Sequence, residues 1–447
     1  MCVSSADHRA TIYQRPVELL QSLIRFDTTN PPGNEAGCIA YIRHLLTEAG
    51  FESAVLAREL GRPNLVTRLA GRGNAPPLLL YGHVDVVTTA DQTWEYPPFE
   101  GKLVDGYVWG RGALDMKGGV AMMLAALLRA KAEGLALPGD VVLAMVSDEE
   151  TGGVCGARYL VENHARLFDG VRHAIGEFGG FTFHIGKRRF YPIMVAEKQV
   201  CVLRAKLRGQ GGHPGLAFRG GAMAKLARFL RQLDRCVLPV HITPVVRWQF
   251  ESLSSALAAP SALLLRQALK PRLTDLVLRL LGARGQVFEP LFHNTVCVTT
   301  VQGGKEPTVT PSEVVLTLRG ATLPGWGPDE LMDEVRRAVG DEIELELVRH
   351  DPGPAEPDMG LFGTLVDVLR EADPGCIPLP MMLPAATDAR FFSRLGIQTY
   401  GFLPMKLPAG FNFSQLVHGA DERIPAESLS FGTRAICEVL QGFDHAI

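Results

Sequence analysis

Three apolar segments of this chain predict buried strands, and each is followed by acidic or histidine side chains. They cover residues 77–80, 141–146 and 173–176. In open α/β sheets, ligands bind in the crevice outside the carboxyl ends of the strands. One acidic cluster alone could be a solvated sheet edge, but several clusters at strand ends indicate a functional site. The pattern therefore favours an α/β fold that collects polar side chains at one edge of its sheet.

The first strand end carries His83 and Asp85. Residues two apart in an extended chain lie on the same face, so an imidazole and a carboxylate can act together there. A histidine that binds a metal usually donates the proton of its other ring nitrogen to a carboxylate or carbonyl. Asp85 is a candidate for that role. Taken alone, the pair is also compatible with a strand-end histidine in a polar loop.

A glycine-rich loop and the ends of the other two segments supply further carboxylates. The loop, residues 110–119, leads into an apolar stretch at 120–128 that predicts a buried helix, so its acid lies in a constrained position at a helix entrance. Three adjacent acids follow the second segment, and they repel one another unless cations neutralise them. These patterns predict a hydrolase built around metal ions, whose candidate acids are Asp115, Asp148, Glu149, Glu150 and Glu177.

The chain has 447 residues and a formal net charge of −3. This length exceeds what a single hydrophobic core usually holds, so we expect two domains. The charge gives no basic footprint for nucleic acid or an anionic membrane, which leaves a small molecule as the expected substrate and partner. No apolar run approaches the ~20 residues of a membrane span. The eight cysteines show no Cys-x-x-Cys spacing and no signal segment opens the chain, so we expect free thiols and a cytoplasmic location.

Strand and helix patterns alternate up to about residue 195, which predicts helices packed around a largely parallel sheet. From residue 198 the order changes to strand, helix, strand, strand, helix, strand, as in ferredoxin-like domains. The Pro-rich run at 351–357 predicts a linker back to the first domain. The strands expected in the second domain are 200–207, 295–301, 314–318 and 343–348, and the expected helices are 222–233 and 328–339.

These motifs resemble those of the metallopeptidase family that contains two-zinc aminoacylases, carboxypeptidase G, acetylornithine deacetylase and succinyl-diaminopimelate desuccinylase. The resemblance begins in residues 19–35, ends in residues 418–424 and is weakest at about 240–292. It implies an α/β zinc-exopeptidase-like catalytic domain with an inserted ferredoxin-like α+β lid domain, through which the chain would form a homodimer. The implied domains are residues 1–197 with 351–447 for catalysis and residues 198–350 for the lid.

The resemblance also implies two zinc ions per chain, with cobalt or manganese as substitutes. His83 and Glu177 would bind one ion, Glu150 and His418 would bind the other, and Asp115 would bridge both. Each ion keeps open coordination for water and substrate, as a catalytic zinc site requires. Glu177 stands where some relatives carry aspartate.

Three further residues receive catalytic roles by the same resemblance. Glu149 would be the general base that takes a proton from a water bridging the zinc ions; its alternative is a helix-capping acid. His213, in the glycine-rich stretch 209–215, would donate a hydrogen bond to the oxyanion, often from the other subunit of a dimer; its alternative is a loop histidine without a partner. Asp85 would support His83.

The second domain departs from the family pattern at a position that bears on specificity. Many relatives carry an arginine, thought to hold a substrate carboxylate, where this chain has Ala321. Arg319 lies two residues earlier on the same strand face, about 6.6 Å away, so its long side chain can partly cover the distance, or it is a solvated edge charge. Asn294 resembles a lid asparagine that contacts substrate, and it is equally compatible with an ordinary loop asparagine.

The segment at 240–292 is longer than a simple lid connection and has apolar residues at helical spacing from 263 to 281. We expect an extra helical hairpin that packs on the lid. A substrate-gating or dimer-contact element is the alternative, and the sequence does not distinguish the two.

The expected activity is hydrolysis of an amide bond in an N-acyl amino acid or a dipeptide-like small substrate. A desuccinylase or carbamoyl-type amidohydrolase of the same architecture is the alternative among enzymes. Outside enzymes, the alternative is a catalytically silent relative that binds peptides or acyl amino acids without turnover. A purely structural protein offers no reason to collect acids at strand ends.

Overall fold

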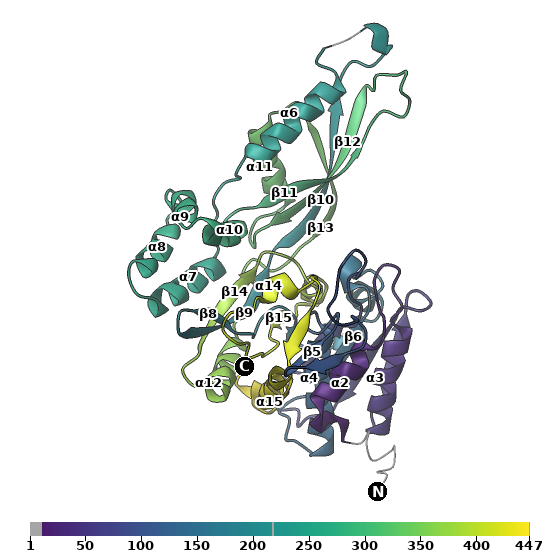
Figure 1. The fold of residues 1–447 in the computed structure, drawn as a ribbon, viewed down its shortest axis with the longest axis vertical. Coiled ribbons are helices and arrows are strands. Elements are labelled where there is room, and N and C mark those ends of the chain that lie inside the picture. Colours follow the sequence, from purple (N-terminus) through teal and green to yellow (C-terminus); the bar gives the residue numbers. More distant parts are fainter. Residues whose placement is uncertain (1–10, 217–218, 447) are drawn as a thin grey trace. The chain divides into compact units, whose positions relative to one another are not determined.

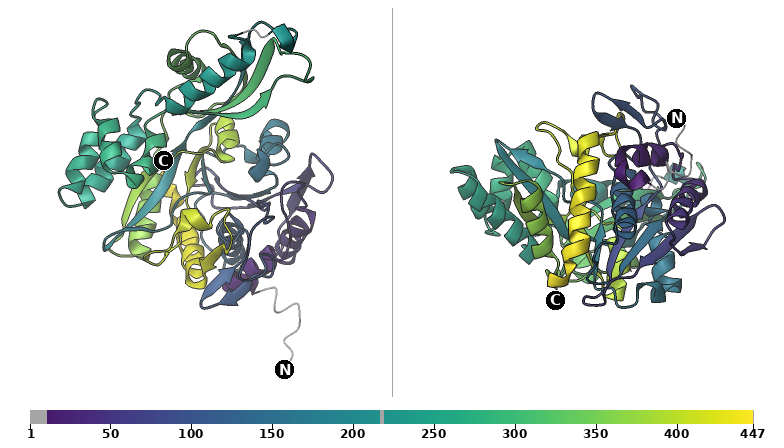
Figure 2. Two further views of the ribbon diagram at one scale, coloured as in Figure 1. Left: turned by 45° about the horizontal axis from the view of Figure 1, so that its top comes forward. Right: turned by 90° about the horizontal axis from the view of Figure 1, so that it is seen from below.

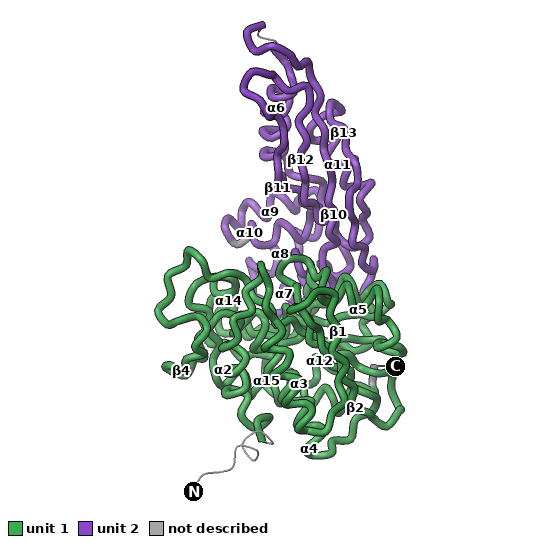
Figure 3. The backbone as a smooth tube through the Cα atoms, turned by 90° about the vertical axis from the view of Figure 1, so that its right-hand side faces the viewer, with its two compact units in different colours: residues 1–195, 358–381, 387–447 green, residues 196–357, 382–386 purple. Residues whose placement is uncertain are grey.

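The computed structural model describes residues 11–216 and 219–446, and the chain divides into two compact units (Figure 3). The segment Met382–Ala386 belongs to the second unit, because the backbone N–H of Lys198 donates to the carbonyl oxygens of Leu383 and Ala385. The domain boundaries expected from the sequence, residues 1–197 with 351–447 for the catalytic domain, include Met382–Ala386 in that domain. Unit 1 comprises Met1–Val195, Asp358–Met381 and Thr387–Ile447, and unit 2 comprises Ala196–Pro357 and Met382–Ala386.

Unit 1 is built on a nine-stranded sheet of order β1-β2-β6-β3-β7-β15-β9-β14, in which β8 pairs with β9 (Figure 1). The central strands β6, β3, β7 and β15 are parallel, whereas β1, β2 and β9 pair antiparallel with their neighbours. The predicted α/β class with a largely parallel centre is confirmed. The strands cover Ser53–Ala57 (β1), Pro63–Leu69 (β2), Leu78–His83 (β3), Val141–Val146 (β6), His173–Gly176 (β7), Phe183–Ile185 (β8), Arg188–Glu197 (β9), Ile377–Leu383 (β14) and Gln398–Gly401 (β15).

The helix predicted after Asp115 is α4, which is buried along nearly its whole length because it packs against β3, α2 and α15. Figure 2 shows α15 as the long yellow helix of unit 1. Helix α12 packs on α15, and α13 packs on α5. The helices cover Pro16–Ile24 (α2), Ala36–Glu48 (α3), Lys117–Ala132 (α4), Ala157–Asn163 (α5), Phe362–Ala372 (α12), Ala389–Phe392 (α13), Phe413–Leu416 (α14) and Ala426–Gly442 (α15).

Both faces of the central strands are covered, which explains their continuous apolar sequences. Every residue of β3 and β6 is buried. On one face, Leu79 of β3 lies in an apolar cluster with Leu160 of α5 and Phe391 of α13. On the other face, Gly82 lies so close to α4 that a Cβ there would approach Val120 Cγ2 to 3.1 Å. This close packing fixes the end of β3 against the entrance of α4.

A smaller sheet of order β16-β5-β4 joins two segments that are far apart in the sequence. Strand β5 (Tyr107–Trp109) precedes the glycine-rich loop that carries Asp115, and it pairs with β4 (Lys102–Val104). Strand β16 (Arg423–Pro425) follows His418 and pairs antiparallel with β5. The two loops are therefore tied together by backbone hydrogen bonds at their ends.

Unit 2 contains an antiparallel sheet of order β11-β12-β10-β13. Its strand, helix, strand, strand, helix, strand sequence confirms the predicted ferredoxin-like arrangement. Cys201, Leu203 and Ala205, alternate residues of β10, are buried in a core that they share with Phe229 and Leu331 of the two helices. The elements are β10 (Gln199–Arg208), α6 (Ala222–Arg235), β11 (Thr295–Gln302), β12 (Glu313–Thr322), α11 (Pro328–Val339) and β13 (Glu344–Asp351).

The insertion between α6 and β11 is not the single hairpin expected from its apolar spacing. Pro260 and Pro271 interrupt helical hydrogen bonding, and Gly282, with φ of 60°, separates the last two helices. A role in gating or dimer contact stays a prediction. The insertion forms α7 (Pro244–Ala256), α8 (Ser261–Ala268), α9 (Thr274–Leu280) and α10 (Ala283–Phe288).

Within residues 11–216 and 219–446, no helix combines the length and the apolar character needed to cross a membrane. The seven cysteines in these ranges carry free thiols, as their spacing led us to expect. Cys2 lies outside the described residues.

Replacing Phe391 with alanine should destabilise unit 1, because its fully buried ring fills the core between α13, α5 and the sheet. Loss of a buried phenylalanine ring typically costs about 3–5 kcal/mol. We expect a lower urea midpoint for unfolding, measured by circular dichroism. Leu103→Ala is the matched control, since Leu103 is 49% exposed, and its effect should stay within about 0.5 kcal/mol. Equal midpoints for the two variants would contradict this assignment of the core.

Candidate metal centre

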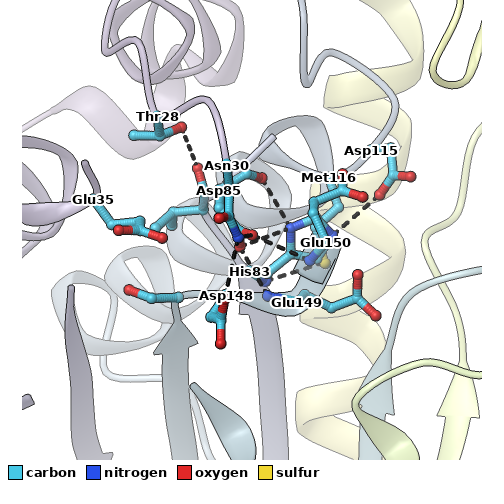
Figure 4. A network of polar contacts seen from close by, with 12 residues as sticks. Thr28, Asn30, Glu35, His83, Asp85, Asp115, Met116, Asp148, Glu149 and Glu150 are labelled. Carbon is cyan, nitrogen blue, oxygen red and sulfur yellow. Dashed lines mark hydrogen bonds and ion pairs between the residues drawn. The ribbon is translucent and has the colours of Figure 1, made fainter. Parts of the chain in front are cut away.

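The candidate site of unit 1 lies at the ends of β3, β6 and β7. Figure 4 shows the residues around His83, Asp85 and Glu149. The acids after β6 lie in η2 (Glu149–Thr151), a single 3-10 turn that begins after Asp148, whose φ is 70°. The other predicted residues come from the remaining strand ends and from two loops. The structure brings together His83 at the end of β3, Glu149 and Glu150 in η2, Glu177 after β7, Asp115 at the entrance of α4 and His418 after α14.

Asp115 lies between the two histidines. His83 Nε2 is 3.1 Å from Asp115 Oδ1 and 3.4 Å from Glu177 Oε2. His418 Nε2 is 3.2 Å from Asp115 Oδ2 and 3.3 Å from Glu150 Oε2. One carboxylate oxygen of Asp115 therefore points at each histidine, and each histidine has a second carboxylate of its own.

These donor atoms fit a pair of divalent cations. Adjacent ligand atoms of a tetrahedral zinc site with metal–ligand distances of about 2.1 Å lie about 3.4 Å apart, close to the four separations above. Among the described residues, Glu150 Oε1 is buried without a hydrogen-bond partner. The groups His83, Glu149, Glu177 and His83, Asp115, Glu150 each present ligand atoms within 4.8 Å of one another.

The electrostatics of the site favour bound positive charge. Burial raises the pKa of Glu177 to about 8, against the opposing effect of His83. Burial and the charge of Glu177 raise the pKa of Glu149 well above its usual value. Asp115 and Glu150 raise the pKa of His418 to about 10. Carboxylates that resist ionisation beside histidines that attract protons are the signature of a strongly negative potential, which cations would relieve.

Asp85 holds the site together through backbone groups as well as its side chain. The Nδ1 atom of His83 lies 3.0 Å from the backbone oxygen of Asp85 and 3.5 Å from its carboxylate, so the nearer proton acceptor is the carbonyl. This leaves Nε2 of His83 facing the other ligands. The Asp85 carboxylate accepts hydrogen bonds from Asn30 Nδ2 and from the backbone N–H groups of Glu149 and Glu150. One residue thus fixes both the ring of His83 and the turn that carries the predicted base.

The three remaining predicted residues belong to unit 2. His213 is exposed in a loop, where its Nδ1 accepts a hydrogen bond from the backbone N–H of Gly215. Arg319 is exposed on β12. Asn294 is buried; its Nδ2 donates to Glu334, and its Oδ1 accepts from the backbone N–H of Leu323. Both ends of the Asn294 amide therefore have partners within unit 2. Contact of these residues with substrate stays a prediction.

Sequence reasoning assigned no role to two polar residues that belong to this site. Asn30 binds Asp85, as described above, and its position in the N-terminal motif was the only signal for it. Asp388 is 1% exposed, and among the described residues neither of its carboxylate oxygens has a hydrogen-bond partner. Burial raises the pKa of Asp388 to about 7. The charge of Asp388 in turn contributes to the raised pKa values of Glu149 and Glu177, which places it beside the metal centre.

An apolar recess opens beside Asp115 and Glu177. The cavity itself is only about 10 Å³, which is room for about one water molecule. Phe181 and Phe413 stack on one another with ring centroids 4.0 Å apart, and both side chains are partly exposed. Phe178, directly after Glu177, is also partly exposed. The lining residues are Leu114, Asp115, Met116, Glu177, Phe178, Phe181, Leu403, Met405 and Phe413.

A carboxylate placed between two histidines beside the strand ends of an α/β sheet is typical of a metallohydrolase, and the comparisons with known proteins agree. Residues 79–442 match the family described as Peptidase family M20/M25/M40, and the chain belongs to this family. It is a hydrolase of peptide or amide bonds.

One curated relative and one solved structure each cover 96% of this chain. N-fatty-acyl-amino acid synthase/hydrolase PM20D1 of Xenopus tropicalis is 25% identical over 449 residues, which span 96% of this chain and 86% of that protein. Succinyl-diaminopimelate desuccinylase of Methylorubrum populi is 38% identical, but over only 33% of this chain and 39% of the enzyme. The solved structure of the M20 family metallo-carboxypeptidase Sso-CP2 from Sulfolobus solfataricus superposes with a TM-score of 0.69 at 15% identity, covering 96% of this chain and 99% of that one.

Removal of bound metal should lower the thermal stability of the protein, because it returns uncompensated charge to buried carboxylates. A ligand present at 100 times its dissociation constant contributes about 2.7 kcal/mol to the folded state. We expect a chelator to lower the unfolding temperature and added zinc to restore it, measured by calorimetry. In Glu177→Gln, the difference in unfolding temperature between the chelated and the zinc-loaded protein should be smaller, because the substitution removes one ligand and one buried charge. A wild-type unfolding temperature that is indifferent to chelation would contradict the metal centre.

Proposed function

We propose that the chain hydrolyses the amide bond of an N-acyl amino acid or a dipeptide-like small substrate with the help of two bound zinc ions. The observation that carries the proposal is the placement of Asp115 between two histidines, each with a second carboxylate. His83 and Glu177 would hold one ion and His418 and Glu150 the other, with Asp115 shared. Bound ions supply Lewis acidity toward a carbonyl oxygen and lower the pKa of a water.

Glu149 is the group that this proposal assigns to proton transfer. Its position in η2 is fixed by the hydrogen bond from its backbone N–H to Asp85 Oδ1. Its raised pKa suits a carboxyl group that accepts a proton from water and then delivers it to the leaving amine. Glu150, the next residue, is directed at His418 instead, so the two adjacent acids have separate tasks.

The partly exposed rings of Phe178, Phe181 and Phe413 support a substrate with an apolar acyl or side-chain group. Partly exposed aromatic rings beside the metal centre offer a contact surface for such a group and no partner for a second carboxylate. The name of the PM20D1 relative describes N-fatty-acyl amino acids, which belong to the same chemical class. The local identity to a desuccinylase favours a succinylated amine as the second candidate substrate, and the apolar lining argues against it.

Residues of unit 2 complete the proposal. His213 would donate a hydrogen bond to the developing oxyanion, and Arg319 would bind a substrate carboxylate in place of the arginine that Ala321 replaces. Asn294 would contact the substrate while its side-chain amide keeps its hydrogen bonds with Leu323 and Glu334. A homodimer through unit 2 is part of this proposal.

Glu149→Gln should lower kcat by about 10²–10⁴-fold, because the amide cannot accept the proton of the attacking water. Amine release from N-acyl amino acids measures this loss, and metal content by mass spectrometry should be nearly unchanged. The exposed Glu52→Gln provides the matched control. An active Glu149→Gln enzyme would overturn the assigned base.

Arg319→Ala should remove a preference for free carboxylates. The wild-type enzyme is expected to hydrolyse an N-acyl amino acid faster than its carboxamide, because a guanidinium binds a carboxylate more strongly than an amide. In Arg319→Ala, KM for the acid should rise while the constants for the carboxamide stay the same. Arg204→Ala, another exposed arginine of the same sheet, is the control. Equal effects of Arg319→Ala on both substrates would refute carboxylate binding by Arg319.

A further inference from the structure

The carboxylate of Glu422 is buried beside the metal centre but is not directed at either histidine. Glu422 is 0% exposed. Its Oε1 accepts hydrogen bonds from the backbone N–H groups of Leu114 at 2.7 Å and Asp115 at 3.1 Å. Its Oε2 accepts from the backbone N–H of Gly112 at 3.1 Å and from Arg111 Nη1 at 2.6 Å. One side chain thus organises the loop that presents Asp115.

The backbone around Glu422 reaches the second histidine. The guanidinium of Arg111, which binds Glu422, donates from Nη2 to the backbone oxygen of His418 at 3.3 Å and to Gln92 Oε1 at 2.8 Å. Gln92 Nε2 donates to the same His418 oxygen at 2.8 Å. The backbone N–H of Gly110 donates to the backbone carbonyl oxygen of Glu422 at 2.9 Å. Hydrogen bonds therefore connect the loop of Asp115 with the loop of His418 both at His418 and at Glu422.

The loop of His418 needs such support more than the other ligands do. The His418 side chain is 50% exposed, whereas the side chains of His83, Glu150 and Glu177 are 2–5% exposed. The backbone of His418 also has φ of 62°, a left-handed conformation that non-glycine residues adopt only when their surroundings hold them there. Packing alone therefore does not place this imidazole.

We propose that Glu422 is a positioning residue that sets the separation of Asp115 and His418, and thereby the affinity of the second metal position, formed by His418, Glu150 and Asp115. This inference rests on the two-metal site of the proposed function. It predicts an asymmetry, because the first position, with His83 and Glu177, takes only Asp115 from the loops that Glu422 joins.

The chemistry of the Glu422 site requires a carboxylate. Four N–H donors converge on its two oxygens, so all four of these hydrogen-bond partners donate. Glutamine of the same size would turn an NH₂ group toward two of these donors. The loop must then shift or leave buried N–H groups unpaired, which costs about 1–3 kcal/mol per group.

The test is zinc titration of metal-free Glu422→Gln by calorimetry, compared with the wild-type chain. We expect two binding events in the wild type. In Glu422→Gln the dissociation constant of one event should rise by about 10–100-fold, as for other groups that orient metal ligands. The constant of the other event should change less than about threefold. At saturating zinc, kcat should recover most of its wild-type value, since the catalytic groups themselves are intact.

Two further variants serve as comparisons. Glu427→Gln, an exposed acid on α15, should leave both binding events unchanged. Gln92→Ala removes a partly exposed side chain that contacts the His418 oxygen, and it should weaken the same binding event by a smaller factor even if Glu422→Gln fails to fold. Equal weakening of both events in Glu422→Gln and Gln92→Ala, or no weakening in either variant, would overturn the role of Glu422. A wild-type chain that binds fewer than two ions would instead overturn the proposed function.

Discussion

The concentration of negative charge around Asp115 is the constraint on which the rest of unit 1 depends. Glu149, Glu150 and Glu177 are held near one carboxylate at the ends of parallel strands, where burial already disfavours their ionised forms. Uncompensated buried carboxylates oppose folding. Two histidines lie among these acids, and the proposed pair of cations would neutralise the remaining charge. The cluster that opposes folding would then also be the catalytic site.

Two buried acids that are not proposed metal ligands, Asp85 and Glu422, hold the proposed ligands in place. Asp85 joins the ring of His83 to the turn of Glu149. Glu422 joins the loop of Asp115 to that of His418 through a set of backbone hydrogen bonds. The strand ends of the sheet are rigid. Asp85 and Glu422 bind the neighbouring loops and so hold the side chains of those loops in fixed positions.

Sequence patterns predicted the strand ends and the ferredoxin-like unit because both are encoded by local periodicity. The continuous apolar sequences of β3 and β6 reflect strands that are buried on both faces. Buried and more exposed residues alternate in β10 because only one face of that strand is buried. The sequence predicted a helical hairpin in the insertion but not its division into four helices, because the apolar pattern at 263–281 continues across Pro271. The role proposed for Glu422 depends on partners in residues 111–115, far away in the sequence. Asp388 likewise comes from a segment distant from Glu149 and Glu177, so no local pattern indicated either residue.

The most direct test of this account is the location of the metal ions in crystals of the zinc-loaded protein, measured by anomalous diffraction at the zinc edge. Two peaks are expected, one beside His83 and Glu177 and one beside His418 and Glu150, with Asp115 between them. A single peak, or peaks away from Asp115, would contradict a shared carboxylate as the centre of the site.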